Sequence, residues 1–265
     1  MSRLPVIEEP PVVGCDVDGT ARVRDPVAAA GTRGVPGWLA DRQGRRLQYL
    51  RLSVTDRCDL RCRYCMPDDG VPASQREDLL SFEEIVRMVR IFAPLGVKTV
   101  RITGGEPLIR KDLPELVRML GGEAGIDDIA LTTNATALHK LARPLASAGV
   151  GRINISVDSI RPETFAHMTR GGDLARVLRG VEAARDAGFA EIKTNSVVVR
   201  GHNDTQLPEV VEWAWARAIV PRFIELMPIG EGARLGRSAV VPVAEMKRRL
   251  AGLLHGGPAE HRLDR

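Results

Sequence analysis

The sequence contains few cysteines, few aromatic residues and no long hydrophobic run. Phe, Trp and Tyr together make up 4% of its 265 residues, which argues against a surface that binds nucleic acid by base stacking. No run approaches the roughly 18 apolar residues that a membrane-spanning helix needs. The N-terminus lacks the unbroken apolar core of a secretory signal. We therefore expect a cytoplasmic protein without a membrane or nucleic-acid partner.

The scarcity of cysteine is informative in its own right. The chain has 4 cysteines, and in a reducing compartment so few thiols indicate a metal or catalytic site rather than disulfides. The net charge of +4 is modest, with Lys and Arg spread along the chain. This charge balance is compatible with a small anionic ligand but does not require one. The length suffices for one α/β barrel or two smaller domains.

Two parts of the chain differ in pattern. Residues 1–40 are rich in Pro, Gly and Ala without periodicity, and we interpret them as a flexible N-terminal extension that contains Cys15. From residue 48 onward, short β-branched runs alternate with amphipathic stretches. Six strands are predicted near residues 49–54, 98–102, 128–132, 152–157, 191–198 and 222–226.

Local signals mark the helices between these strands. Ser81 with Glu84 forms a capping-box pattern at a helix start, and Gly96, Gly149 and Gly188 stand where helices should end. Strands that alternate with helices predict a parallel sheet with the helices packed outside it. Six units are too few for a closed barrel of eight strands. The α/β fold is therefore either a partial, open barrel or a doubly wound sheet.

Polar residues collect at the carboxyl ends of the predicted strands, where both of these folds bind their ligands. They are Thr103, Gly105, Thr132 to Asn134, Ser156, Asp158, Lys193, Asn195, Glu225 and Met227. The other three cysteines follow the first strand, on the same rim. We expect the functional site there.

The stretch "CDLRCRYC" holds Cys58, Cys62 and Cys65. A zinc site usually takes four protein ligands, or three and a water molecule, and no histidine lies near these thiols. Three buried structural cysteines are a weak alternative, because the segment is too polar for a core. Three thiolates suit an iron–sulfur cubane better, since one of its four irons then remains open to a ligand.

This spacing, with Tyr64 before the last cysteine, resembles the radical S-adenosylmethionine superfamily. "RITGGEP" at residues 101–107 is similar to the glycine-rich motif of that superfamily, which holds the cofactor's amino group. The resemblance implies that the open iron binds S-adenosylmethionine and that an electron cleaves it to a 5′-deoxyadenosyl radical. We expect glycine at position 105 because a Cβ atom there would obstruct the ligand.

A narrower resemblance covers residues 41–254. "YLRLSVTDRCDLRCRYCMP", "VRITGGEPLIRKDL", "IALTTNA", "GRINISVDS", "IKTNSVV" and "RFIELMPIG" together resemble the GTP 3′,8-cyclase family of molybdenum cofactor biosynthesis. The resemblance implies a partial (β/α)6 radical-SAM barrel, open on one side, and conversion of GTP to its 3′,8-cyclised dihydro product. It also implies a reductant, a cyclic pyranopterin synthase as pathway partner, and a homodimer.

The same resemblance assigns residues to roles. It implies that a single [4Fe–4S] cluster is bound by Cys58, Cys62 and Cys65. S-adenosylmethionine is contacted by Tyr64, Gly105, Ser156 and Met227, and GTP by Arg51, Arg101, Thr132 and Lys193. Without the resemblance, Met227 would be interpreted as core packing and Ser156 as a strand-end hydrogen bond. No side chain is assigned a catalytic role.

The sequence departs from the family pattern in two places. Ala135 stands where the family has glycine, so a turn that favours positive φ is expected to be strained or reshaped. No cysteine follows Cys65, and residues 255–265 form the tail where the family's second-cluster region, which binds guanine, would begin. We therefore expect weak GTP binding and cofactor cleavage without cyclised product. A radical enzyme for another substrate, such as a peptide or nucleoside, and a cluster-binding remnant are alternatives.

Overall fold

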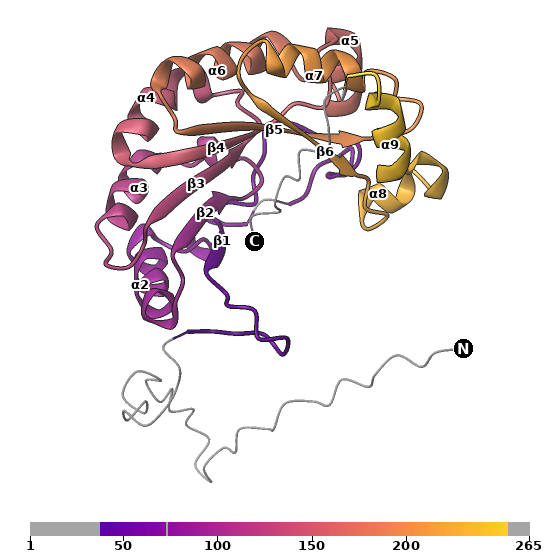
Figure 1. Ribbon diagram of the computed structural model, residues 1–265. Helices are drawn as coiled ribbons and strands as arrows, with labels where there is room; N and C mark the ends of the chain where they lie inside the picture. Colours follow the sequence, from indigo (N-terminus) through magenta and orange to yellow (C-terminus); the bar gives the residue numbers. More distant parts are fainter. Residues whose placement is uncertain (1–37, 73, 254–265) are drawn as a thin grey trace. The chain divides into compact units, whose positions relative to one another are not determined.

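The computed structural model describes residues 38–72 and 74–253 (Figure 1). Cys15, most of the predicted N-terminal extension and the predicted tail lie outside the described residues. Six β-strands follow one another along the chain. They are β1 (Tyr49–Ser53), β2 (Thr99–Thr103), β3 (Asp128–Thr133), β4 (Val150–Ser156), β5 (Glu191–Val198) and β6 (Val220–Glu225). All six predicted strands are thus confirmed.

The strands form one parallel sheet in the order β1-β2-β3-β4-β5-β6. A doubly wound sheet would reverse its strand order at a switch point, whereas here each strand pairs with its successor along the chain. The two end strands, β1 and β6, do not pair with each other. The fold is therefore a partial, open α/β barrel, as the family resemblance implies and as one of the two folds that the sequence pattern allows.

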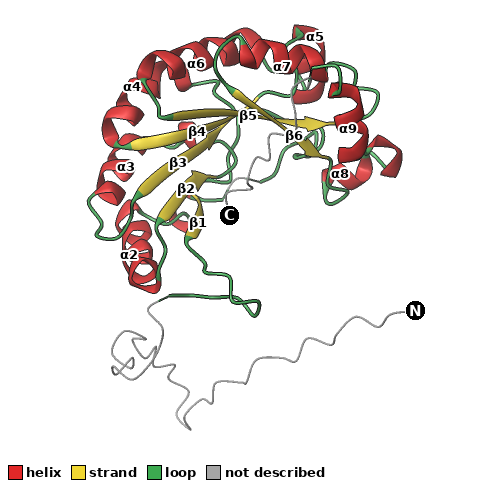
Figure 2. Ribbon diagram, viewed as in Figure 1, coloured by secondary structure: helices red, strands yellow, loops and turns green. Residues whose placement is uncertain are grey.

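Helices pack along the outer side of the curved sheet, and the loops that follow the strands gather at one rim (Figure 2). The α-helices are α2 (Phe82–Phe92), α3 (Leu113–Gly121), α4 (Leu138–Ala148), α5 (Pro162–Thr169), α6 (Leu174–Ala187), α7 (Leu207–Trp215), α8 (Glu231–Arg234) and α9 (Val243–Leu250). Short 3-10 helices are η1 (Arg76–Asp78), η2 (Ala93–Leu95), η3 (Pro107–Ile109) and η4 (Arg237–Ala239). No helix in the described residues is long and apolar enough to cross a membrane.

The predicted helix boundaries are present. Ser81 caps α2 through a reciprocal capping box with Glu84. Gly96, Gly149 and Gly188 follow their helices with φ of 97°, 115° and 79°, a region that costs glycine little because it has no Cβ.

Successive side chains along each strand point alternately to the two faces of the sheet. Val100 and Ile102 of β2, like Ile153 and Ile155 of β4, have exposed fractions of 0% and face the helices. Residues between them, such as Arg101, point to the inner face instead, because successive strand side chains point to opposite sides. The hydrophobic core therefore lies between sheet and helices, and it leaves the concave face free for polar side chains.

Ala135 adopts the backbone conformation that its sequence context predicted. Its φ is 62°, and the residue is fully buried after β3. The left-handed region costs an alanine roughly 1 kcal/mol. The turn is fixed from outside, because Gly180 of α6 packs on the Ala135 carbonyl so closely that a Cβ at position 180 would lie 2.3 Å from that oxygen.

Candidate active site

The three predicted cluster ligands lie on the irregular loop that follows β1. Cys58 and Cys62 are half-buried, Cys65 is exposed, and all three thiols are free. The Cys62 carbonyl accepts hydrogen bonds from the backbone N–H groups of Cys65 and Met66, each at 2.9 Å. This turn brings the last two cysteines to the same side of the loop. The loop starts at the carboxyl end of a strand, where the fold places ligand sites.

Arg61 and Arg170 bind backbone carbonyl groups of the cysteine loop. Arg61 donates to the Cys58 carbonyl at 2.6 Å. Arg170, at the end of α5, donates to the carbonyls of Arg61 and Met66 at 2.9 and 2.7 Å. The guanidinium of Arg170 also forms an ion pair with Asp68. A loop without regular structure is thus held at both ends of its cysteine segment.

The thiols are in an environment that disfavours free thiolates. Burial raises the pKa of each of the three, and the negative charge of Asp158, followed by those of Cys65 and Cys58, raises the pKa of Cys62 further. Within the described residues, no three His, Cys, Asp or Glu side chains converge on a position for one metal ion. A mononuclear zinc site needs such convergence, whereas a cluster spreads its thiolates over separate irons. The residues present therefore fit a cluster better than a zinc ion.

The glycine-rich turn after β2 packs against the cysteine loop. The Gly105 N–H donates to the Thr55 carbonyl and the Glu106 N–H to the Arg57 carbonyl, both at 2.7 Å. A Cβ at Gly105 would lie 2.3 Å from the Arg57 carbonyl oxygen, a contact that no real Cβ atom makes. The expected reason for glycine at this position was therefore incomplete, because the protein's own backbone already excludes a side chain there.

Glu106 of this turn connects the three rim loops. Its buried carboxylate accepts hydrogen bonds from the Leu108 N–H at 2.9 Å, the Thr133 hydroxyl at 2.6 Å and the Asn134 N–H at 2.6 Å. The Asn134 amide in turn donates to Asp59, beside the first cysteine, at 2.7 Å. Burial raises the pKa of Glu106 to about 7. Sequence reasoning missed this residue, although its position in "GGEP" was visible.

Tyr64, one of the predicted cofactor contacts, is held by a buried carboxylate. Its hydroxyl donates to Asp158 Oδ2 at 2.7 Å, and Asp158 Oδ1 accepts from the Val197 N–H at 2.8 Å. Burial raises the pKa of Asp158 to about 6. Because the hydroxyl proton is already donated to Asp158, Tyr64 has no hydroxyl donor left for a cofactor.

The other two predicted cofactor contacts also lie on the rim. Ser156 is the last residue of β4, and Met227 follows β6. Met227 is 63% exposed, which rules out the interpretation as core packing. The structure therefore leaves the side chain of Met227 free to contact a ligand.

The four predicted GTP contacts share the inner face of the sheet. Arg51 and Arg101 are register partners on β1 and β2. Thr132 and Lys193 both pair with Asn154 of β4, from either side. Four residues from four strands thus form two adjacent cross-strand rows, as their alternation predicts.

Positive charge on this inner face is only partly compensated. Lys193 pairs with Glu191 at 2.8 Å, and Arg152 pairs with Asp128. Arg101 forms no ion pair within the described part of the chain; its Nη1 is 3.4 Å from the Thr132 hydroxyl, and its buried Nε has no hydrogen-bond partner. Burial, followed by the charges of Arg222 and Arg152, lowers the pKa of Arg101. The inner face therefore carries positive charge at Arg101 that no described carboxylate neutralises, a charge that an anion could pair with.

Arg222 of β6 belongs to this face, and sequence reasoning missed it. It pairs in register with Asn195 and donates to that amide oxygen at 3.1 Å. The signal was available in the alternation along "VPRFIEL", where Arg222 and Ile224 fall on the same side of the strand. Arg51, Arg101 and Arg222 therefore bring positive charge from both ends of the open sheet.

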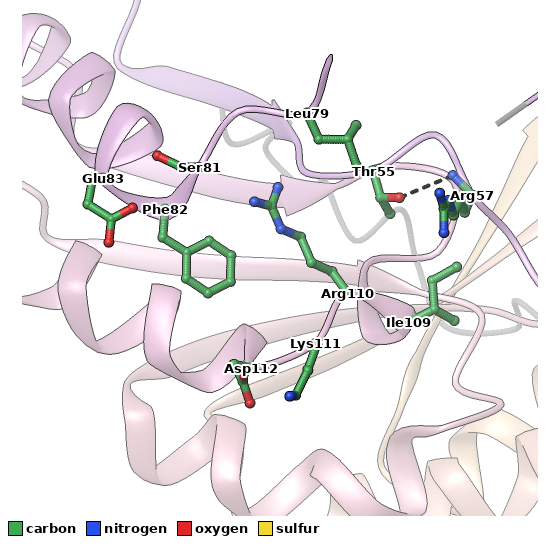
Figure 3. Close-up of a pocket in the computed structure, with 10 residues that line it drawn as sticks. All are labelled: Thr55, Arg57, Leu79, Ser81, Phe82, Glu83, Ile109, Arg110, Lys111 and Asp112. Atoms are coloured by element: carbon green, nitrogen blue, oxygen red, sulfur yellow. Dashed lines mark hydrogen bonds between the residues drawn. The ribbon is translucent and has the colours of Figure 1, made fainter. Parts of the chain in front are cut away.

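Cavities near the rim are separate from the inner face. One of about 580 Å³ lies outside the rim between α2 and η3, and it is lined by Arg57, Phe82 and Arg110 but by none of the three cysteines (Figure 3). Arg110 is occupied there, because it donates to the carbonyls of Val54 and Leu80 and stacks on Phe82. A second cavity of about 360 Å³ is lined by Cys58.

Comparison with known proteins agrees with this geometry. Residues 52–214 match the radical SAM superfamily. The GTP 3′,8-cyclase of Pelotomaculum thermopropionicum is 44% identical over 233 residues, which are 84% of this chain and 72% of that protein. The GTP 3′,8-cyclase of Marinobacter nauticus is 45% identical over 232 residues, covering 84% of this chain and 70% of the relative.

Solved structures support the fold alone, since their sequences are distant. The FeFe-hydrogenase maturase HydG from Carboxydothermus hydrogenoformans aligns with a TM-score of 0.57 at 19% identity, over 77% of this chain and 50% of that chain. TYW1 aligns with a TM-score of 0.58 at 15% identity, over 78% and 72%. The chain belongs to the radical SAM superfamily and, within it, to the GTP 3′,8-cyclase family.

Proposed function

We propose that this protein is a radical S-adenosylmethionine enzyme that acts on GTP in molybdenum cofactor biosynthesis, as a GTP 3′,8-cyclase. One observation carries the proposal. Three free thiols lie on the loop after β1, at the carboxyl rim of a parallel sheet whose inner face presents Arg51, Arg101 and Arg222, which form no ion pair with any described residue. The identity of 44% to a GTP 3′,8-cyclase over most of the chain supports the substrate.

In this proposal Cys58, Cys62 and Cys65 hold one [4Fe–4S] cluster. When bound, the cluster and S-adenosylmethionine supply a 5′-deoxyadenosyl radical, with the electron coming from an external reductant. The chain's own residues bind the cofactors, orient the substrate and exclude water. The backbone around Gly105, together with Ser156 and Met227, forms the rim on which the cofactor would lie, and Tyr64 anchors the loop.

The inner face would bind the triphosphate. Arg51, Arg101 and Arg222 offer guanidinium groups that can pair with phosphate oxygens in bidentate fashion. Lys193 is paired with Glu191 at 2.8 Å, so its charge is partly compensated. Charge pairing of this kind is screened by salt, so GTP affinity should fall as salt is added.

The test is isotope transfer from GTP. The reconstituted protein, reduced with dithionite, receives S-adenosylmethionine and GTP that carries deuterium at the ribose 3′ carbon. We expect deuterium in part of the 5′-deoxyadenosine, because the triphosphate contacts hold the nucleotide but do not by themselves fix its ribose against the cofactor. Formation of 5′-deoxyadenosine without any deuterium, while GTP is bound, would contradict hydrogen abstraction from the ribose 3′ carbon of GTP.

A further inference from the structure

Asp158 joins the cysteine loop to the ends of two strands. It follows β4 by two residues and has an exposed fraction of 4%. One of its oxygens accepts from the Tyr64 hydroxyl at 2.7 Å and the other from the Val197 N–H of β5 at 2.8 Å. Tyr64 itself lies between Cys62 and Cys65. A single carboxylate thus connects the segment between Cys62 and Cys65 with the strand ends on the rim that carries Ser156.

The backbone that carries this carboxylate is held in place by the side chain of Asn203. Asn203 donates through Nδ2 to the Asp158 carbonyl at 2.7 Å and to the Val197 carbonyl at 2.9 Å. Its Oδ1 accepts from the Val199 N–H at 2.8 Å. Because this amide bonds both Asp158 and β5, the position of the carboxylate is determined by the sheet rather than by the cysteine loop.

The ring of Tyr64 is fixed as well. It packs against a small apolar cluster of Met168, Val199, Leu226 and Ala239, which is separate from the main core. Leu226 precedes Met227 on the same rim. The phenol group therefore has one end in apolar packing and the other on a charged acceptor, an arrangement that fixes a side chain in both position and rotation.

We propose that Asp158 is a positioning residue that, through the Tyr64 hydroxyl, sets the place of the cluster-binding segment relative to the S-adenosylmethionine rim. A loop without regular secondary structure can bind a cluster in more than one place. Binding of S-adenosylmethionine depends on the relative position of two parts of the protein, the loop and the strand ends. The hydrogen bond between Tyr64 and Asp158 is a direct link between those parts.

Two single variants, Tyr64→Phe and Asp158→Asn, test this link, and the geometry predicts effects of different size on it. Tyr64→Phe removes one oxygen and leaves the ring in its apolar cluster, so folding should be preserved. In Asp158→Asn, Oδ1 can still accept from the Val197 N–H, and the amide nitrogen then faces the phenol oxygen, which can accept from it. The link becomes weaker and reverses its polarity but is not lost. Tyr64→Phe should therefore have the larger effect.

The measurement is S-adenosylmethionine binding to the reconstituted, reduced protein, followed by the change that the cofactor causes in the electron paramagnetic resonance spectrum. We expect wild-type iron content in both variants and an unchanged spectrum without cofactor. The apparent Kd for S-adenosylmethionine should rise about tenfold in Tyr64→Phe, which corresponds to about 1.4 kcal/mol, and less in Asp158→Asn. The double variant should match Tyr64→Phe alone, because Tyr64→Phe already removes the bond that Asp158→Asn only weakens. Asp186→Asn, on the exposed side of α6, is the matched control.

Three results would overturn the proposal. Wild-type affinity in both variants would show that the bond does not position the loop for the cofactor. Loss of iron in both variants would show that the bond serves folding or cluster assembly rather than cofactor positioning. Effects that add in the double variant would mean that Tyr64 and Asp158 act separately. Since the cofactor is S-adenosylmethionine and no GTP is used, failure here leaves the proposed substrate untouched.

Discussion

Glu106 should make the stability of this protein depend on pH. The residue is 1% exposed, and burial raises the pKa of its carboxyl group from 4.5 to about 7. Between those values the folded chain holds a proton that the unfolded chain has lost. The free energy of unfolding must then fall as pH rises through this window. This difference in pKa between the folded and unfolded chain corresponds to about 3 kcal/mol.

The Glu106→Gln variant isolates this contribution. Glutamine can keep the bonds from Leu108 and Thr133 through its oxygen, but its amide nitrogen then faces the Asn134 N–H. We expect a constant cost of about 1–3 kcal/mol for that unsatisfied pair of donors. Because glutamine does not titrate, the advantage of wild type over variant should shrink by about 3 kcal/mol as pH rises from about 5 to about 8. The two proteins should be similarly stable at the upper end.

Urea unfolding followed by circular dichroism at several pH values measures this difference directly. Burial raises the pKa of Asp158 in the same direction, but that contribution is present in both proteins and cancels. Glu163→Gln, on the exposed first turn of α5, is the matched control for the exchange of glutamate for glutamine. If the difference for Glu106→Gln does not change with pH, Glu106 remains ionised, held by its three donors, and the reasoning from burial is wrong.

Further predictions concern packing, the cluster and the nucleotide. Gly180→Ala should lower the free energy of unfolding by about 2 kcal/mol or more, because its Cβ would meet the Ala135 carbonyl oxygen at 2.3 Å; an unchanged urea midpoint would contradict this packing. Gly105→Val should lower iron content as well as cofactor binding, since the clash is with the Arg57 backbone of the cysteine loop; full iron content would mean that the loop adapts. Cys15→Ala should keep about four irons per chain, whereas loss of the cluster would point to a fourth thiolate ligand. Arg222→Ala should weaken GTP binding about tenfold and reduce its salt dependence; unchanged affinity in a titration would remove Arg222 from the site.

Much of the fold follows from local pattern, and the small errors have physical reasons. The predicted starts of β4 and β6 are each two residues late. Gly151 and Pro221 lie in those first residues, and both residue types normally disfavour strands. Pro221 is tolerated because β6 is an edge strand. The choice between barrel and doubly wound sheet depended on strand order, which periodicity does not contain.

The site was only partly predictable. Alternation places Arg51, Arg101, Thr132 and Lys193 on one face, and the structure shows them in adjacent rows. What pairs with each cation could not be read from the sequence. The bond between Tyr64 and Asp158 joins residues 94 positions apart, and such contacts depend on how the rim loops pack together. The residue types indicated the chemistry of the site, whereas the pairing of its side chains became visible only in the folded structure.

The measurement that tests the central claim most directly is reductive cleavage of S-adenosylmethionine by the reconstituted protein. Under anaerobic conditions with dithionite, the account predicts that 5′-deoxyadenosine forms, and that Cys62→Ser, which removes one of the three free thiols on the loop after β1, abolishes it. Cleavage that survives in Cys62→Ser, or no 5′-deoxyadenosine from wild-type protein that holds about four irons and binds the cofactor, would contradict the assignment of this loop as a radical S-adenosylmethionine site.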